Sequence, residues 1–208
     1  MGALRPSLGS GEIRYYQLFM RLILASASPR RAELLSSAGF QFEVSPADVD
    51  ETPKPSESPT TYALRVAFDK ALAVGARRRD ADGVVLSADT VVVANGVILG
   101  KPADAVDAVR MLHLLANAVH DVHTAVVIRA PAGERAEVVT TRVTFLPLDD
   151  EEIASYVASG EPEGKAGAYA IQGRAARFVD RIEGSWSNVV GLPLATVYRL
   201  LKEVSDVD

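Results

Sequence analysis

The sequence predicts an α/β protein with one mixed β-sheet, flanking helices and two lobes around a cleft. Short segments rich in β-branched residues alternate with longer segments in which apolar residues recur at helical spacing. The dipeptide Asn95-Gly96 separates two apolar runs, a pattern typical of a tight antiparallel hairpin. Strands joined by helices together with strands joined by hairpins require a sheet of mixed direction.

The first predicted unit is a strand, a turn and a helix. Residues Arg21 to Ala25 read as a short buried strand, and a helical pattern follows as far as Gly39. Ser28 suits the N-cap position, and Pro29 suits the first helical position because its φ is fixed and it lacks an N–H. Gly39 can take the left-handed conformation that ends a helix.

The remaining elements follow from the same signals. A stretch rich in Pro, Ser and acidic residues at 45–59 breaks all periodicity and predicts a long surface loop. We expect further strands at residues 40–44, 84–93, 97–99, 122–129 and 137–145. We expect further helices at 60–76, after Pro102 through Leu115, from Asp149 or Asp150 to near Gly160, and after Pro193.

Composition excludes several classes of function. The 208 residues contain no cysteine, which removes thiol nucleophiles, zinc ribbons, disulfides and iron–sulfur clusters. A formal net charge of -5 argues against binding to a nucleic acid polymer. No apolar run approaches the roughly 20 residues that a membrane-spanning helix needs. We therefore expect a cytoplasmic protein that has no membrane partner.

Residues 1–19 fit no periodic pattern, and Met20 lies directly before the first predicted strand. They also lack the apolar core of a secretory signal. We interpret them as a leader or a mis-called start, and a native N-terminal extension is the alternative. Residues 20–208 are expected to form a single domain.

Two arginines occupy an unfavourable place in the first predicted helix. Arg30 and Arg31 lie in its first turn, where each cation costs about 0.3 to 1 kcal/mol against the helix dipole. An anionic ligand reverses that sign, because backbone N–H groups and both guanidinium groups then face one phosphate cluster. The small Ser26 leaves room and adds a hydroxyl. The alternative is that both arginines extend into solvent or pair with the acidic residues of the 45–59 loop.

Asp89 is the second anomaly. It is a carboxylate inside an apolar strand, where desolvation costs several kcal/mol unless a partner compensates it. One candidate partner is a divalent cation, in which case Asp89 can orient a metal-bound water as general base for attack on phosphorus. The other candidates are a lysine or backbone amides, which would make the carboxylate structural. Lys101, just past the hairpin, can lie near the same site.

Two glycine-rich tracts, KAGAYAIQG and EGSWSNVVGLPL, hold a third group of polar residues. Gln172 can read a nucleobase edge with its paired donor and acceptor. Such tracts more often serve only turns, so this signal is weak by itself. The polar residues of this group are Lys165, Gln172, Ser187 and Asn188. The histidines form no metal-binding cluster and are interpreted as structural or surface residues.

Five segments in this order resemble the Maf family of nucleoside triphosphate pyrophosphatases: LILASASPRRAELL, VVLSADTVVV, GVILGKP, KAGAYAIQG and GSWSNVVGLPL. The similarity covers nearly the whole chain from about Met20. It implies a fold like that of inosine triphosphate pyrophosphatases, with a deep cleft, and a homodimer. One departure is Asn117-Ala118-Val119, where family members commonly carry Ser-Gly and a basic or polar residue.

The resemblance also implies a role for each site residue. Asp89 would be the catalytic base, and Arg30, Thr90 and Gln172 would set substrate choice. Arg30 would also hold the triphosphate. The residues that would join it in binding the triphosphate or complete the charged site are Ser26, Arg31, Glu51, Lys70 and Lys101.

The expected activity is hydrolysis of dTTP, UTP and modified pyrimidine nucleotides to the monophosphate and pyrophosphate. A divalent cation, Mg²⁺ or Mn²⁺, would neutralise the phosphates, with Asp89 and Glu51 as its protein ligands. The rival enzyme is a pyrophosphatase acting on 7-methyl-GTP. The rival of another class is a non-catalytic nucleotide-binding regulator of septum formation, which would bind nucleotide and release no pyrophosphate.

Overall fold

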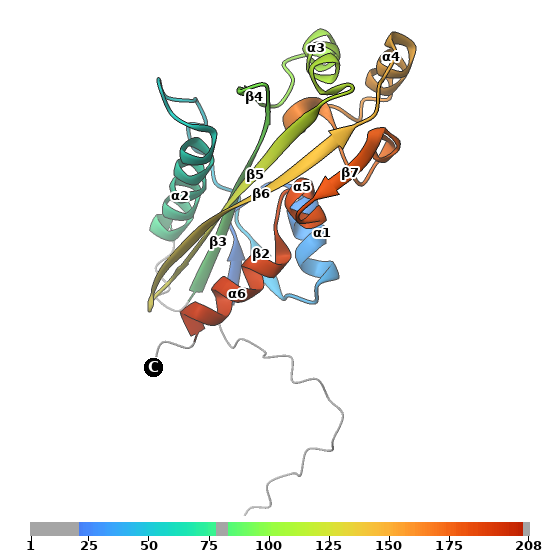
Figure 1. Cartoon of the computed structure of the whole chain (residues 1–208). Helices are drawn as coiled ribbons and strands as arrows, with labels where there is room; N and C mark the ends of the chain where they lie inside the picture. The colour runs from blue at the N-terminus through green and yellow to red at the C-terminus, as the bar shows by residue number, and fades with distance from the viewer. Residues whose placement is uncertain (1–20, 78–82, 206–208) are drawn as a thin grey trace, which may run out of the picture.

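The computed structural model describes residues 21–77 and 83–205 (Figure 1). The predicted leader at 1–19 lies outside the described residues. The strands are β1 (Arg21–Leu24), β2 (Phe42–Val44), β3 (Gly83–Ala94), β4 (Val97–Leu99), β5 (Val119–Ala130), β6 (Gly133–Phe145) and β7 (Val179–Glu183). The α-helices are α1 (Pro29–Ser37), α2 (Pro59–Arg77), α3 (Ala105–Leu115), α4 (Asp150–Ala158), α5 (Trp186–Val190) and α6 (Leu194–Ser205). Two short 3₁₀ helices are η1 (Ala166–Ala168) and η2 (Arg174–Phe178).

The sheet is mixed, as predicted. Its seven strands lie in the order β2-β1-β3-β5-β6-β7, with β4 paired to β3. β1 runs parallel to β2 and β3, whereas the β3–β4, β3–β5, β5–β6 and β6–β7 pairs are antiparallel. Asn95 and Gly96 have φ values of 50° and 76°, so the turn between β3 and β4 has the two left-handed residues that a type I′ hairpin requires.

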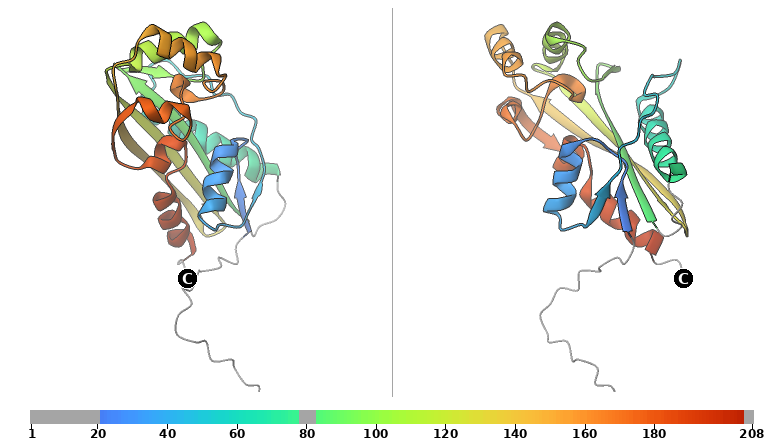
Figure 2. Two further views of the ribbon diagram at one scale, coloured as in Figure 1. Left: turned by 90° about the vertical axis from the view of Figure 1, so that its right-hand side faces the viewer. Right: turned by 180° about the vertical axis from the view of Figure 1, so that it is seen from behind.

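Helices cover both faces of the sheet (Figure 2). α2 packs its small apolar residues, such as Ala67 and Ala71, on one face against Val85 and Val127. The other helices, with η1 and η2, cover the opposite face and form the larger core. Side chains of β3 alternate between the two cores, since Leu86 and its neighbours at even positions pack away from α2. α/β layering of this kind confirms the predicted fold class.

The order of the first three strands reverses at β1. From β1 the chain passes through α1 to β2 on one side, and it returns through α2 to β3 on the other side. α1 and α2 lie on opposite faces of the sheet. Open α/β sheets bind ligands outside the carboxyl ends of their strands at such a switch point. The segment that follows Leu24 and begins α1 therefore lies where a ligand is expected.

A short stretch of β3 has an open edge at the same point. β1 pairs with β3 only as far as Leu86, and β4 begins to pair at Val92. β5 occupies the other edge of β3 from Val85 to Val93, so β1 and β4 share one edge and leave a gap between them. Asp89 and Thr90 lie in this gap.

Long strands connect two groups of elements, in agreement with a two-lobed arrangement. β1, β2, α1 and α6 lie toward one end of β3, β5 and β6, and α3, α4, β4 and η1 lie toward the other (Figures 1 and 2). The cleft between them stays a prediction. No helix within the described ranges is both long and apolar enough to cross a membrane.

Two local expectations need correction. Ser28 is at the N-cap of α1, but its side chain makes no capping hydrogen bond, and its backbone N–H donates to Ser26 Oγ at 3.2 Å. β7 and α5 were not predicted, because their segments are short and are ordered by pairing with β6 and packing on β5 and β6.

The atypical Asn117 adopts φ 52° in the turn that joins α3 to β5. Asparagine tolerates this left-handed region.

Candidate active site

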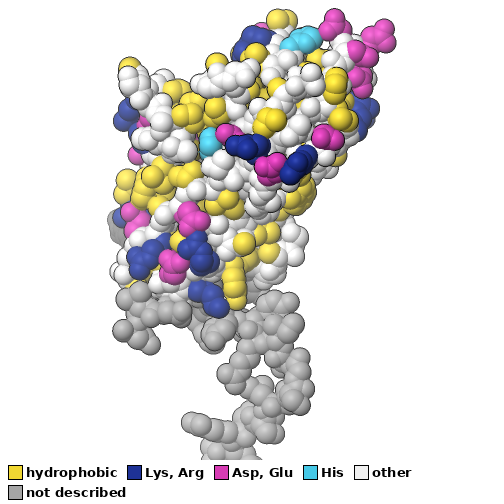
Figure 3. All heavy atoms as spheres, viewed as in Figure 1, with side chains coloured by type: hydrophobic (Ala, Val, Ile, Leu, Met, Phe, Trp, Pro, Cys, Tyr) yellow, Lys and Arg dark blue, Asp and Glu magenta, His cyan; other side chains and the backbone are white. Residues whose placement is uncertain are grey.

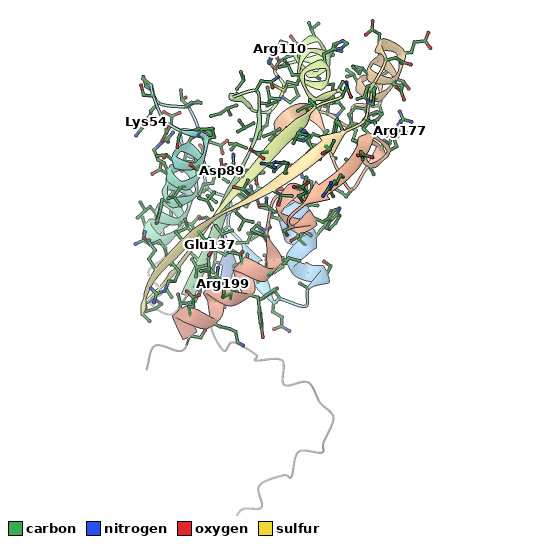
Figure 4. The ribbon with its side chains drawn as sticks, viewed as in Figure 1. Lys54, Asp89, Arg110, Glu137, Arg177 and Arg199 are labelled. Carbon is green, nitrogen blue, oxygen red and sulfur yellow. The ribbon has the colours of Figure 1, made fainter. Side chains whose placement is uncertain are left out.

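Asp89 points from β3 toward α2 in the middle of the molecule (Figure 4). The residue is only 7% exposed, and Lys70 Nζ on α2 donates a hydrogen bond to its Oδ1 at 2.8 Å. Of the partners considered from the sequence, the structure supplies the lysine, which is the partner expected of a structural carboxylate, and it leaves Oδ2 without a hydrogen bond within the described ranges. A buried carboxylate that accepts a hydrogen bond from a buried ammonium is held in one orientation.

The same lysine connects Asp89 to the loop before α2. Lys70 Nζ lies 2.8 Å from Glu51 Oε1, and Lys101 Nζ lies 3.6 Å from Glu51 Oε2. Burial raises the pKa of Glu51, but the two lysines outweigh it and the net pKa is lowered. Tyr62 donates its hydroxyl to the Glu51 carbonyl at 2.7 Å, which holds this loop on α2. Four of the predicted residues are thus one charged cluster.

Arg31 is a buried cation that lacks a direct ion pair. Its three donor contacts are Nε to Gly191 O at 2.8 Å, Nη1 to Ser26 Oγ at 3.1 Å and Nη2 to Thr90 Oγ1 at 3.1 Å. Within residues 21–77 and 83–205 no carboxylate oxygen lies within 4.0 Å of it. Burial lowers the pKa of Arg31, and the charge of Asp89 offsets part of that effect. Arg31 does not extend into solvent, and within the described ranges it does not pair with the 45–59 loop. A bound anion would therefore balance its buried charge.

Arg30 and Lys165 place two further cations near each other. Arg30 is partly buried in the first turn of α1, and burial lowers its pKa. Burial and then the charge of Arg30 lower the pKa of Lys165, which lies just before η1. Two like charges held together at a helix N-terminus favour binding of an anion.

The remaining polar candidates separate into two kinds. Gln172 is exposed in the turn between η1 and η2 and makes no side-chain hydrogen bond within the described part of the chain. Ser187 and Asn188 instead hold structure together: Ser187 Oγ accepts from Leu194 N at 3.1 Å, and the Asn188 side chain is fully buried. Both residues lie in α5 and not in a turn, so the expectation that their tract serves only turns is wrong for them, although their role is structural.

Comparison with known proteins places these residues in a family. A family model described as Maf-like protein matches residues 21–204. The chain belongs to the Maf family. The chain is 52% identical over 184 residues to the dTTP/UTP pyrophosphatase of Geobacter metallireducens, covering 88% of this chain and 95% of that protein. It is 53% identical over 186 residues to the enzyme of the same name from Geobacter sulfurreducens, covering 88% and 96%. The Koribacter versatilis protein of that name is 51% identical over 187 residues, covering 90% and 96%.

Among solved structures, a protein from Vibrio cholerae aligns with this Maf chain at a TM-score of 0.33 and 12% identity, covering 63% of this chain and 65% of that one. A similarity this low carries no argument about fold or function.

The residues that this Maf protein offers to a metal are two carboxylates. Within the described ranges no group of three or more His, Cys, Asp and Glu side chains is placed to hold an ion. Glu51 and Asp89 converge on the same Lys70 ammonium. Mg²⁺ is usually bound through one or two carboxylates, with substrate phosphates and water as its other ligands. The donor set of this site fits that pattern.

Sequence reasoning missed three residues of the site in this Maf protein. Tyr62 was hidden among the apolar positions of α2, Thr124 is a single polar residue within β5, and Gly191 contributes only a backbone carbonyl. The polar interruption of an apolar strand, which identified Asp89, was also present at Thr124. It is the one signal that could have found any of the three.

Proposed function

We propose that this Maf protein hydrolyses nucleoside triphosphates, with dTTP and UTP as its main substrates, to the nucleoside monophosphate and pyrophosphate. The observation that carries the proposal is that the open edge of β3 holds a buried carboxylate, Asp89, and a buried cation, Arg31, that are not paired with each other. Asp89 has a lysine to hold it, whereas Arg31 has no carboxylate partner among the residues that the structure describes. The names of the relatives favour pyrimidine nucleotides as substrates.

Asp89 is assigned as general base. Its carboxylate accepts the proton of a water that attacks the α-phosphorus, and pyrophosphate leaves. Lys70 orients the carboxylate from the α2 side through the 2.8 Å hydrogen bond to Oδ1. The other oxygen, Oδ2, has no hydrogen bond within the described ranges and can accept the proton.

The substrate phosphates would lie against the first turn of α1. Arg31, Arg30 and Ser26 offer guanidinium and hydroxyl donors there, and the helix dipole adds positive potential. Charge builds on the leaving pyrophosphate during cleavage, so fixed cations lower the barrier by electrostatic stabilisation.

A divalent cation, Mg²⁺ or Mn²⁺, is part of this proposal. Glu51 and Asp89 would hold it, and it would neutralise phosphate charge when bound. Lys70 pairs with both carboxylates and Lys101 pairs with Glu51, and these contacts orient the two groups toward each other.

Substrate choice is assigned to Arg30, Thr90 and Gln172. Gln172 is exposed in the turn between η1 and η2, where its amide is free to donate to and accept from a base edge. Binding to a nucleic acid polymer is not part of the proposal. Basic side chains lie beside acidic ones on the face in Figure 3. The surface ion pairs Arg142–Asp121 and Arg135–Glu203 are of this kind. A homodimer stays a prediction.

The test is pyrophosphate release from a panel of canonical and modified nucleoside triphosphates, with and without Mg²⁺. We expect dTTP and UTP to be cleaved fastest, and only with the metal present. Preference for 7-methyl-GTP would overturn the assignment of substrate. Tight nucleotide binding with no pyrophosphate from any substrate would favour the regulatory protein.

A further inference from the structure

A chain of two hydroxyl groups leads from Arg31 into the sheet, the first on the partly buried Thr90 and the second on the fully buried Thr124. Thr90 on β3 and Thr124 on β5 are directly paired in the antiparallel register, and their hydroxyl oxygens are 3.0 Å apart. Arg31 Nη2 donates to Thr90 Oγ1 at 3.1 Å, and Thr124 Oγ1 donates to the Asn188 carbonyl at 3.1 Å. Thr124 has no exposed surface at all.

The contacts at the two ends of this hydroxyl chain determine which oxygen donates and which accepts. A threonine hydroxyl has one proton and two lone pairs. Thr124 gives its proton to the Asn188 carbonyl, so its oxygen can only accept from Thr90. Thr90 then has its lone pairs available for Arg31. The Thr90 proton has two acceptors, the Thr124 oxygen at 3.0 Å and the Gly191 carbonyl at 3.4 Å. The shorter contact favours Thr124, which thereby orients the Thr90 hydroxyl that receives the guanidinium.

A second tether reaches Arg31 from the end of α5. Arg31 Nε donates to the Gly191 carbonyl at 2.8 Å. Gly191 has φ 123°, a backbone conformation that other residues rarely adopt, whereas a Cβ there would meet only ordinary contacts with Thr90 Oγ1 at 3.5 Å and Arg31 Nε at 3.7 Å. A glycine is therefore needed to aim this carbonyl.

Asn188 anchors the same segment to the sheet. Its side-chain amide donates to Thr141 Oγ1 at 2.9 Å and to the Val122 carbonyl at 3.0 Å, on β6 and β5. Residues 188–191 thus hold two of the acceptors that terminate the network: the Asn188 carbonyl for Thr124 and the Gly191 carbonyl for Arg31. These contacts give the SWSNVVG tract a role that the sequence did not assign.

We propose that Thr124 is a positioning residue for the reaction, which acts through Thr90 to hold the Arg31 guanidinium in the orientation that meets the substrate phosphates. The inference rests on the proposed function, because it takes Arg31 as a phosphate ligand. It adds that Thr124, a residue of β5 that does not touch substrate, sets the orientation of Arg31 from the edge of β3 that pairs with β5.

The experiment compares Thr124→Val, which removes the hydroxyl at equal size, with Thr124→Ser, which keeps it. We expect Thr124→Val to lower kcat/KM for dTTP about tenfold, the equivalent of about one lost hydrogen bond. Thr124→Ser should retain the wild-type value within about threefold. The matched control is Thr144→Val, the same change at a half-buried position on β6 outside this network.

A double-mutant cycle separates positioning from general packing. In the background of Arg31→Lys, which cannot reproduce the three directed contacts, Thr124→Val should cause no further loss. An equal tenfold loss in both backgrounds, or the same loss in the Thr144→Val control, would overturn the proposal and leave Thr124 a packing residue.

Binding of inorganic pyrophosphate to the same proteins distinguishes failure of this inference from failure of the proposed function. If the wild type cleaves no nucleotide, the proposed function fails, and calorimetric titration with pyrophosphate still tests the inference. We expect Thr124→Val to raise the Kd about tenfold in the wild-type background and not in Arg31→Lys. No pyrophosphate binding by the wild type, or additive effects on Kd, would contradict it.

Discussion

Lys70 on α2 donates a 2.8 Å hydrogen bond to Asp89 on β3, and both residues are buried. The two residues are 19 positions apart in the sequence, and their pair links α2 to β3. Coulombic attraction in such a site compensates the desolvation of both charges only while both are present. Removal of either partner therefore has consequences for stability as well as for activity.

The first prediction concerns Lys70→Met. This change leaves the Asp89 carboxylate buried without its cation, and we expect the free energy of unfolding to fall by about 3 kcal/mol. Urea denaturation at neutral pH measures it. The control is Lys101→Met, since Lys101 is 64% exposed and its pair with Glu51 should contribute at most about 1 kcal/mol. A loss for Lys70→Met no larger than for the control would refute the role of the buried pair.

The second prediction concerns the metal. Glu51→Gln keeps the size of the side chain but removes its charge, so we expect the Mg²⁺ concentration for half-maximal rate to rise about tenfold or more. Chelation of the metal should abolish turnover by the wild type. Asp48→Asn, an exposed change in the same loop, serves as control. An unchanged Mg²⁺ requirement in Glu51→Gln would exclude Glu51 as a metal ligand.

The third prediction concerns pH and His120. Burial lowers the pKa of His120 from 6.5 to about 4, with partial opposition from Asp121, and its Nε2 lies 2.9 Å from the Tyr169 hydroxyl. The unfolded chain then binds the proton more readily, so stability falls as pH drops from 6.5 toward 4, by about 3 kcal/mol from this group. Above pH 6.5 the group contributes no further change.

Thermal or urea unfolding across this pH range checks the His120 prediction. His120→Gln should flatten the pH dependence between 6.5 and 4, while His113→Gln, a change on the exposed face of α3, should keep the wild-type slope. Parallel curves for the wild type and His120→Gln would show that His120 is not the responsible group.

The fourth prediction concerns the turn that carries Gln172. The Tyr156 hydroxyl donates to Glu161 Oε1 at 2.9 Å and accepts from Ala170 N at 3.2 Å, while Glu161 Oε2 accepts from Arg174 N at 3.0 Å. These contacts clamp both ends of the turn. Tyr156→Phe removes the shared hydroxyl, so we expect the preference for dTTP over dCTP, as a ratio of kcat/KM, to fall about fivefold.

The exposed Tyr198 supplies the control for that change. Tyr198→Phe removes a hydroxyl from α6 and should leave the dTTP to dCTP ratio unaltered. If Tyr156→Phe lowers stability but keeps the ratio, the turn does not govern base choice.

The sequence sufficed for those features that depend on local chemistry. Pro29, the Asn95-Gly96 turn and the apolar spacing of α2 each act within a few residues, and the structure confirms the elements that they predicted. Asp89 was found because a carboxylate in an apolar strand is costly wherever it occurs. Its partner stayed open between a metal, a lysine and backbone amides, since that choice depends on how α2 lies on β3.

What the sequence did not reveal arises from long-range packing. β7 and α5 are five residues each and gain their order from the strands beside them. Gly191 contributes a backbone carbonyl to the site, and the sequence does not reveal where a backbone carbonyl points. Ser187 and Asn188 resembled ligands by type, and only the buried hydrogen bonds of Asn188 showed that they support the site instead.

The central claim is that Asp89 activates water for cleavage between the α- and β-phosphates. The most direct test is single-turnover hydrolysis of dTTP by wild type and Asp89→Asn in ¹⁸O-labelled water, with unfolding curves to verify the fold. We expect one pyrophosphate per dTMP, label in dTMP only, and a rate about 10²- to 10⁴-fold lower in Asp89→Asn. Full turnover by a folded Asp89→Asn protein, or label in pyrophosphate, would contradict it.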